Sequence, residues 1–123
     1  MIKVAITSPS LESAINISGI ANHTKLVINN TSQTVKYSHI IIGKKDAQKR
    51  NIFWFLKQVN IVFNFFKKIR PVDIVHLNVP LAHLSIIINI VLVLLAKVSR
   101  KKIIIHFRGG ELGFQGRHNF WHR

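Results

Sequence analysis

The residues best suited to chemistry lie near the end of the sequence, in KKIIIHFRGGELG (residues 101–113). His106 and Arg108 close a β-branched run two residues apart, so they share one face of a predicted strand. A histidine can act as a general base toward a hydroxyl group, and an arginine fork can hold a phosphate. Gly109–Gly110 have no side chains, so the backbone beside His106 and Arg108 is accessible. Glu111 is one of only four acidic residues. The alternative for His106 is a histidine packed in the core, and the alternative for Glu111 is a solvated residue that pairs with surplus lysines.

Two other places in the sequence have similar potential. His76 and Asn78 also lie two apart near the end of a predicted strand, VDIVHLN. Ser18 and Gly19 lie where a helix is predicted to begin, and the backbone N–H groups of a helix start suit a phosphate. Each feature also has a structural interpretation, because a buried histidine can bond to backbone and a serine can cap a helix.

Several kinds of site are not expected. His118 and His122 are spaced i and i+4, but no HExxH frame or third ligand accompanies them, so we predict no metal site. Aspartate occurs only at positions 46 and 73, which supports no Ser-His-Asp arrangement. The glycine spacing of dinucleotide and P-loop motifs is absent, and we predict no cofactor. Without cysteine, disulfides and thiolate metal sites are excluded.

The charge is strongly unbalanced. Eighteen Lys and Arg residues stand against four acidic ones, a formal net charge of +14 in 123 residues. This balance favours nucleic acid, anionic lipid or phosphorylated substrates as partners. No helix-turn-helix, zinc finger or RNP-type motif is present, so nucleic acid is not the expected partner. The opening MIKVAITSPS has too short an apolar run for a secretory signal peptide, and we expect a cytoplasmic protein.

Apolar strands alternate with helices along the sequence. Strands are predicted over 2–7, 35–43, 72–78 and 102–107, with helices over 20–29, from 52 to Pro71, and from Pro80 to the SRKK stretch. Such apolar strands indicate a mainly parallel sheet covered on both faces. We therefore predict an α/β, Rossmann-like doubly wound domain over residues 1–123. The first, third and fourth strand ends are expected to converge on one crevice.

Two helices raise the question of a membrane. LAHLSIIINIVLVLLA (81–96) is shorter than the roughly 20 residues needed to span a bilayer. We expect it to pack on the sheet; the alternatives are an interfacial or a spanning helix. The basic helix 52–69 has apolar residues at helical spacing, namely Ile52, Phe55, Val59, Val62, Phe63, Phe66 and Ile69, with Phe53, Trp54 and Phe65 left over. It is predicted to be either a core helix with snorkelling lysines or a surface for anionic lipid.

Taken in order, MIKVAITSPS…SGIANHTKLVI, DIVHLNVP and KKIIIHFRGGEL resemble the N-terminal domain of family-4 retaining glycosyltransferases of the GT-B fold. The resemblance covers nearly the whole chain and depends on the order and position of these segments. It implies two Rossmann-like domains with the active site in the cleft between them. The N-terminal domain would hold the acceptor, and the C-terminal domain would hold the nucleotide sugar and carry a catalytic carboxylate.

The resemblance also implies roles for particular residues. Ser18–Gly19 would face the donor diphosphate, and His106–Glu111 would line the acceptor side. From its place on the third strand, Asn78 is also expected to bind substrate. Relatives commonly place a histidine directly before the glycine pair, where this chain has Arg108. The catalytic histidine role would therefore fall to His106, two residues earlier on the same face, or be absent. The implied acceptor is a glycan, polysaccharide or lipid-linked sugar, in many relatives at the cytoplasmic membrane face.

The chain ends soon after its fourth predicted strand, so we expect an incomplete GT-B N-terminal half without the C-terminal donor-binding domain. We expect no glycosyl transfer by these residues alone. One alternative is a non-catalytic subunit that completes its cleft with a C-terminal partner chain. Another is a small basic module that binds membrane or nucleic acid.

Overall fold

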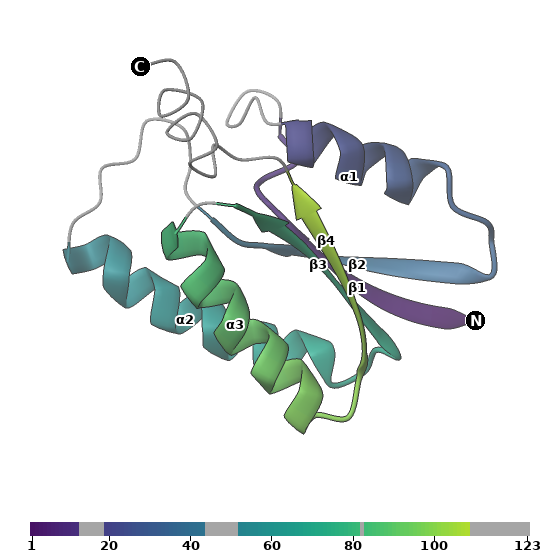
Figure 1. Ribbon diagram of the computed structural model, residues 1–123. Coiled ribbons are helices and arrows are strands. Elements are labelled where there is room, and N and C mark those ends of the chain that lie inside the picture. Colours follow the sequence, from purple (N-terminus) through teal and green to yellow (C-terminus); the bar gives the residue numbers. More distant parts are fainter. Residues whose placement is uncertain (13–18, 44–51, 82, 109–123) are drawn as a thin grey trace, which may run out of the picture.

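The computed structural model describes residues 1–12, 19–43, 52–81 and 83–108. In chain order the elements are β1 (Ile2–Ser8), α1 (Gly19–Asn29), β2 (Val35–Ile41), α2 (Ile52–Ile69), β3 (Ile74–Pro80), α3 (His83–Val98) and β4 (Lys102–Arg108) (Figure 1). This alternation confirms the predicted α/β, Rossmann-like doubly wound fold.

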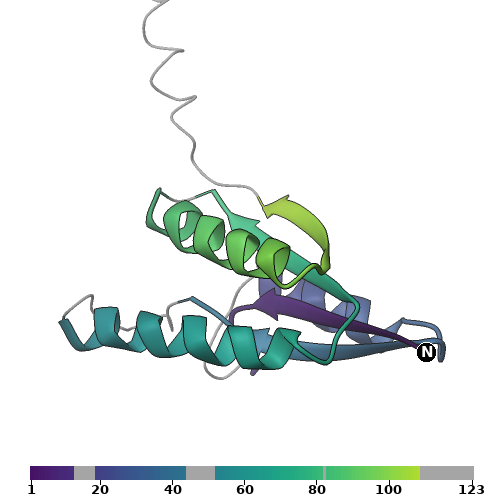
Figure 2. The ribbon, with the colours of Figure 1, turned by 90° about the horizontal axis from the view of Figure 1, so that it is seen from below.

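The described strands form one parallel, four-stranded sheet in the order β2-β1-β3-β4. The chain adds β2 on one side of β1 and then adds β3 and β4 on the other side, so the direction of strand addition reverses between β1 and β3. Helix α1 covers one face of the sheet, and α2 with α3 covers the other (Figures 1 and 2). In such sheets the reversal point, at the carboxyl ends of the strands, is the usual place for a ligand.

The main core lies between the sheet and the α2–α3 layer. Val75 and Leu77 of β3 are fully buried there, together with Phe65 of α2 and Leu92 and Ala96 of α3. On the opposite face α1 packs on β1 and buries Ala21 and Thr24. Leu26, the leucine of this helix, is exposed. The α1 layer is thus built partly on polar contacts.

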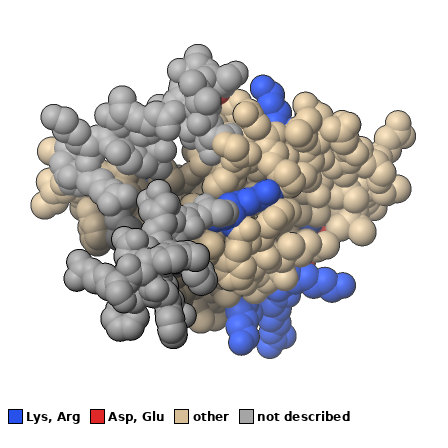
Figure 3. Space-filling model, turned by 45° about the horizontal axis from the view of Figure 1, so that its top comes forward, with Lys and Arg blue, Asp and Glu red and all other residues tan. Residues whose placement is uncertain are grey.

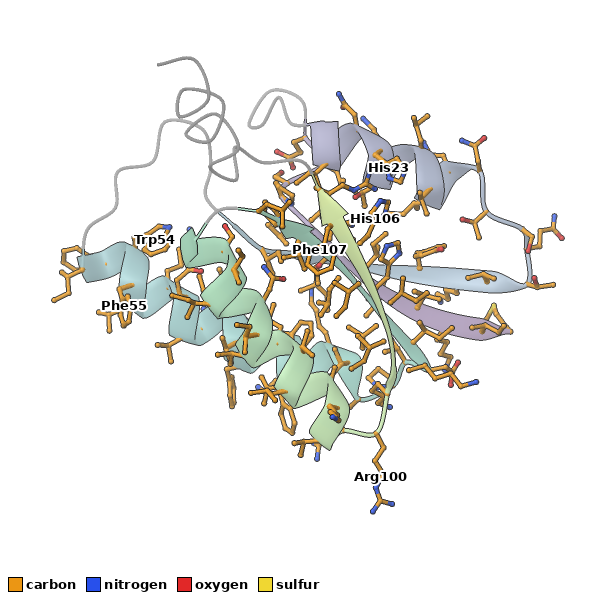
Figure 4. The ribbon with its side chains drawn as sticks, in the orientation of Figure 1. His23, Trp54, Phe55, Arg100, His106 and Phe107 are labelled. Carbon is orange, nitrogen blue, oxygen red and sulfur yellow. The ribbon has the colours of Figure 1, made fainter. Side chains whose placement is uncertain are left out.

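The buried face of α2 matches the predicted one only in part: Ile69 is buried as expected, but other members of the series are not. Trp54 and Phe65, which seemed surplus to the apolar face, are 7% and 0% exposed, whereas Phe55 is 63% exposed. Figure 4 shows Trp54 and Phe55 leaving opposite sides of the helix. Apolar residues recur at helical spacing on both sides of α2, so the period predicts the helix but does not choose the side that meets the sheet.

The boundary between β3 and α3 also differs from the prediction. Pro80 does not open the helix: it ends β3, paired with Arg108, and α3 begins at His83. The pairing of β3 with β1 stops at Leu77. A proline three residues later therefore interrupts no hydrogen bond of that ladder.

Helix α3 packs on the sheet through one side, as predicted, and leaves its other side exposed. Among the described residues, no helix is long and apolar enough to cross a bilayer.

Candidate functional site

Side chains from β3, β4 and α1 meet at the carboxyl edge of the sheet. In the β3–β4 ladder Asn78 pairs with His106, and Pro80 pairs with Arg108. The predicted convergence of the third and fourth strand ends is therefore confirmed. Helix α1 adds His23, whose ring lies edge-on to that of His106 with 5.6 Å between the ring centroids (Figure 4).

Asn78 holds this edge together. It is 2% exposed, and its amide nitrogen donates to the carbonyl oxygen of Thr7 on β1 (2.8 Å) and to the hydroxyl of Thr24 on α1 (3.3 Å). Its backbone N–H also donates to the Thr7 hydroxyl at 3.1 Å. Its side-chain oxygen accepts a bond from Arg108 Nε at 3.3 Å. One buried amide thus links both strands that flank β3 with the covering helix.

The arginine is held at two points by neutral groups. Besides Asn78, Arg108 Nη2 bonds to Nδ1 of His23. Because a guanidinium only donates hydrogen bonds, this Nδ1 must accept, and His23 is neutral in this arrangement. The positive charge of Arg108 is therefore positioned without being neutralised by either partner.

Histidines line the site beside this arginine. The rings of His76 and His106 are stacked, with 6.0 Å between centroids and an interplanar angle of 7°. His76 Nε2 is buried without a hydrogen-bond partner in the part of the chain that the structure describes. Burial lowers the pKa of His76, and the nearby His106, Arg108 and His23 lower it further. The pKa of His23 is also lowered, first by desolvation and then by Arg108 and His106.

A separate serine–histidine pair joins β1 to β2. Ser8 Oγ lies 2.8 Å from His39 Nε2, and the serine hydroxyl donates to the carbonyl of Pro9, also at 2.8 Å. Burial is the main cause that lowers the pKa of His39. Because Ser8 is fully buried and its proton is already donated to a carbonyl, this pair fits a structural link between strands rather than a nucleophile.

We expect the free energy of unfolding to decrease as pH falls from about 7.5 to about 5.5. The pKa values of His23, His39 and His76 are lowered in the folded chain. Below about pH 6.5 the unfolded chain takes up protons that the folded chain does not, so protonation favours unfolding. Urea unfolding at constant ionic strength would measure this slope.

The control is His76→Gln, which removes one of these groups. Its stability should depend less steeply on pH than that of the wild type over the same interval. A wild type whose stability rises on acidification, or a variant with an undiminished slope, would contradict the expectation.

The structure includes only some of the predicted site residues. Asn78, His106 and Arg108 come together, and Gly19 begins α1 with open space where a side chain would extend. Ser18, Gly109–Gly110 and Glu111 lie outside the described residues, as do His118 and His122. The described residues contain no group of metal-binding side chains. A cavity of about 200 Å³ lies between Lys3, Lys36 and Val72, at the opposite edge of the sheet.

Sequence reasoning missed His23 and Thr24. Their positions follow Gly19 by four and five residues, one helical turn from the predicted phosphate-binding loop. That spacing is the signal that could have found them. Using it requires the knowledge that side chains of α1, which packs on β1, reach Asn78 on β3 and Arg108 on β4.

Comparison with known proteins adds no assignment. No family model matches the chain, and no curated protein or solved structure matches it either.

Proposed function

We propose that this chain is the acceptor-side domain of an enzyme that transfers a sugar from a nucleotide sugar to a glycan, polysaccharide or lipid-linked acceptor. The observation that supports it is the meeting of Asn78, His106 and Arg108 with His23 at the carboxyl edge. This edge adjoins the strand reversal, where sheets of this kind bind ligands. The sequence resemblance to family-4 N-terminal domains supports the same proposal.

Each residue has a chemical task in this proposal. Sugar hydroxyls both donate and accept hydrogen bonds, which suits imidazoles and a guanidinium side by side. His106 would accept the proton of the attacking acceptor hydroxyl, a task that imidazole performs near neutral pH. Arg108, held by the buried amide of Asn78, would orient the acceptor. The donor would be held by a second domain or a partner chain.

Binding of uncharged glycans to the purified chain would test this proposal. A panel of neutral saccharides, followed by saturation-transfer NMR, should contain ligands that bind the wild type. His106→Ala should weaken their binding about tenfold, the loss expected for a direct hydrogen-bond partner. The matched control is His39→Ala, because His39 lies on β2 away from this group. Binding that His106→Ala leaves intact, or a panel without ligands, would count against the proposal.

A second candidate function is peripheral binding to an anionic membrane at its cytoplasmic face. It is favoured by large apolar side chains exposed on the outer sides of α2 and α3: Ile52, Phe53, Phe55, Leu56, Val59, Phe63, Ile87, Ile90, Val91, Leu94 and Val98. Exposed cations flank them, and Lys67 Nζ lies 4.6 Å from the centre of the Phe63 ring. Apolar side chains with surrounding lysines match the interface of anionic lipids.

Co-sedimentation with lipid vesicles would test this candidate. We expect binding to phosphatidylcholine vesicles that contain phosphatidylglycerol, and much less binding to phosphatidylcholine alone or at about 1 M salt. Leu56→Glu on α2 should abolish binding. Leu26→Glu on α1 is the matched control, because both leucines are 61% exposed and lie on helices of opposite layers. Equal losses in the two variants would exclude the α2–α3 surface as the binding face.

A further inference from the structure

Neither of the two described carboxylates, Glu12 and Asp73, is among the groups that shift the pKa of His23, His76 or Arg108. Asp73, one of the two described carboxylates, lies at the amino edge of the sheet and accepts a bond from the Lys3 backbone N–H at 2.8 Å. Burial lowers the pKa of Arg108, and no described carboxylate acts in the opposite direction. Lys and Arg side chains predominate over Asp and Glu on the molecular face in Figure 3.

The geometry of this group leaves donors free for a ligand. Arg108 uses Nε toward Asn78 and one Nη2 hydrogen toward His23, so other guanidinium N–H groups remain outside these bonds. The stacked rings of His76 and His106 and the edge-on ring of His23 lie beside the arginine, and each ring is half-buried. Water and small ions can therefore reach a site whose charge the protein has already desolvated in part.

An anion with several oxygens also matches this arrangement. A planar guanidinium binds two oxygens of one phosphate, and imidazoles become hydrogen-bond donors at both nitrogens when protonated. A nearby dianion would favour the protonated form of His76, whose Nε2 has no hydrogen-bond partner among the described residues. Phosphoryl groups also occur in both kinds of substrate of the proposed reaction, in the nucleotide sugar and in a sugar-phosphate or lipid-phosphate acceptor.

We propose that Arg108, His23, His76 and His106 form a binding site for the phosphoryl group of a transfer substrate. The role in transfer rests on the proposed function, whereas the anion site itself stands on the geometry of the four side chains. Asn78 is the positioning residue, because its buried amide fixes the guanidinium at Nε.

Inorganic pyrophosphate and sulfate are suitable probes because they contain no sugar, nucleoside or lipid. At about pH 6 and constant ionic strength, we expect saturable binding by calorimetry, and proton uptake when buffers of different ionisation enthalpy are compared. Arg108→Gln should weaken affinity about tenfold or more. Lys102→Gln, which removes the same charge from the other end of β4, should keep affinity within about twofold.

Equal losses in the two variants would show general attraction to a basic chain and would overturn the site. NMR of the wild type makes the test independent of how Arg108→Gln folds. The chemical shifts of the ring signals of His23, His76 and His106 should change as pyrophosphate is added. Unchanged ring shifts would also overturn the site. The affinities for uridine diphosphate and glucose 1-phosphate then identify the source of the phosphoryl group. Tighter binding of uridine diphosphate would indicate the nucleotide-sugar donor, and tighter binding of glucose 1-phosphate would indicate the acceptor. The probes carry no glycan, so the saccharide experiment is a separate test. Failure of neutral saccharides to bind would contradict the proposed function but not the anion site.

Discussion

Phe65→Ala should lower the free energy of unfolding by about 3–5 kcal/mol, the range observed when a buried phenylalanine is truncated. Phe65 is 0% exposed and packs in the core cluster between the sheet and α2–α3, together with Ile69 and Leu77. Truncation would remove apolar contacts and leave a cavity that rigid strands on one side cannot fill. Urea unfolding followed by far-UV circular dichroism would measure the loss.

Phe55→Ala is the matched control, because it makes the same chemical change in the same helix at a residue that is 63% exposed. It should change stability by no more than about 0.5 kcal/mol. The two variants compare the buried and exposed sides of α2 directly. Similar losses in both, or a larger loss for Phe55→Ala, would mean that α2 packs through the side predicted from sequence.

The contrast between these phenylalanines explains why the elements of this fold could be predicted better than their orientation. Strands such as β1 and β4 are marked by β-branched runs, and Pro71 marks the end of α2. These signals are local. The side of α2 that meets the sheet depends on packing against β3 and α3, and a helix with two apolar sides contains no local signal for that choice.

The candidate site was predictable to a similar extent. Alternation along a strand places His106 with Arg108 and His76 with Asn78, and the carboxyl ends of parallel strands meet at one edge. These inferences need no knowledge of strand order. The contribution of His23 does need it, because α1 reaches β4 only when β3 and β4 lie beside β1 in the order β2-β1-β3-β4.

Asn78→Leu should be the other strongly destabilising substitution, although leucine has the same branched arrangement of heavy atoms as asparagine. The change removes the bonds from the Asn78 amide to the Thr7 carbonyl and the Thr24 hydroxyl, and the acceptor for Arg108 Nε. Each buried group left unsatisfied costs about 1–3 kcal/mol, so we expect a loss of about 2–4 kcal/mol in urea unfolding. Asn64→Leu, on the exposed side of α2, should change stability by no more than about 0.5 kcal/mol.

The same substitution separates the structural role of Asn78 from its role in the site. If the amide positions Arg108, Asn78→Leu should weaken pyrophosphate binding under conditions where the variant remains folded. Adding it to Arg108→Gln should then weaken binding little further, because both changes act on the same guanidinium. Additive losses would mean that Asn78 acts on binding by another route. Stability equal to that of Asn64→Leu would mean that the amide network contributes little to folding, because strand pairing and apolar packing alone would then hold the carboxyl edge.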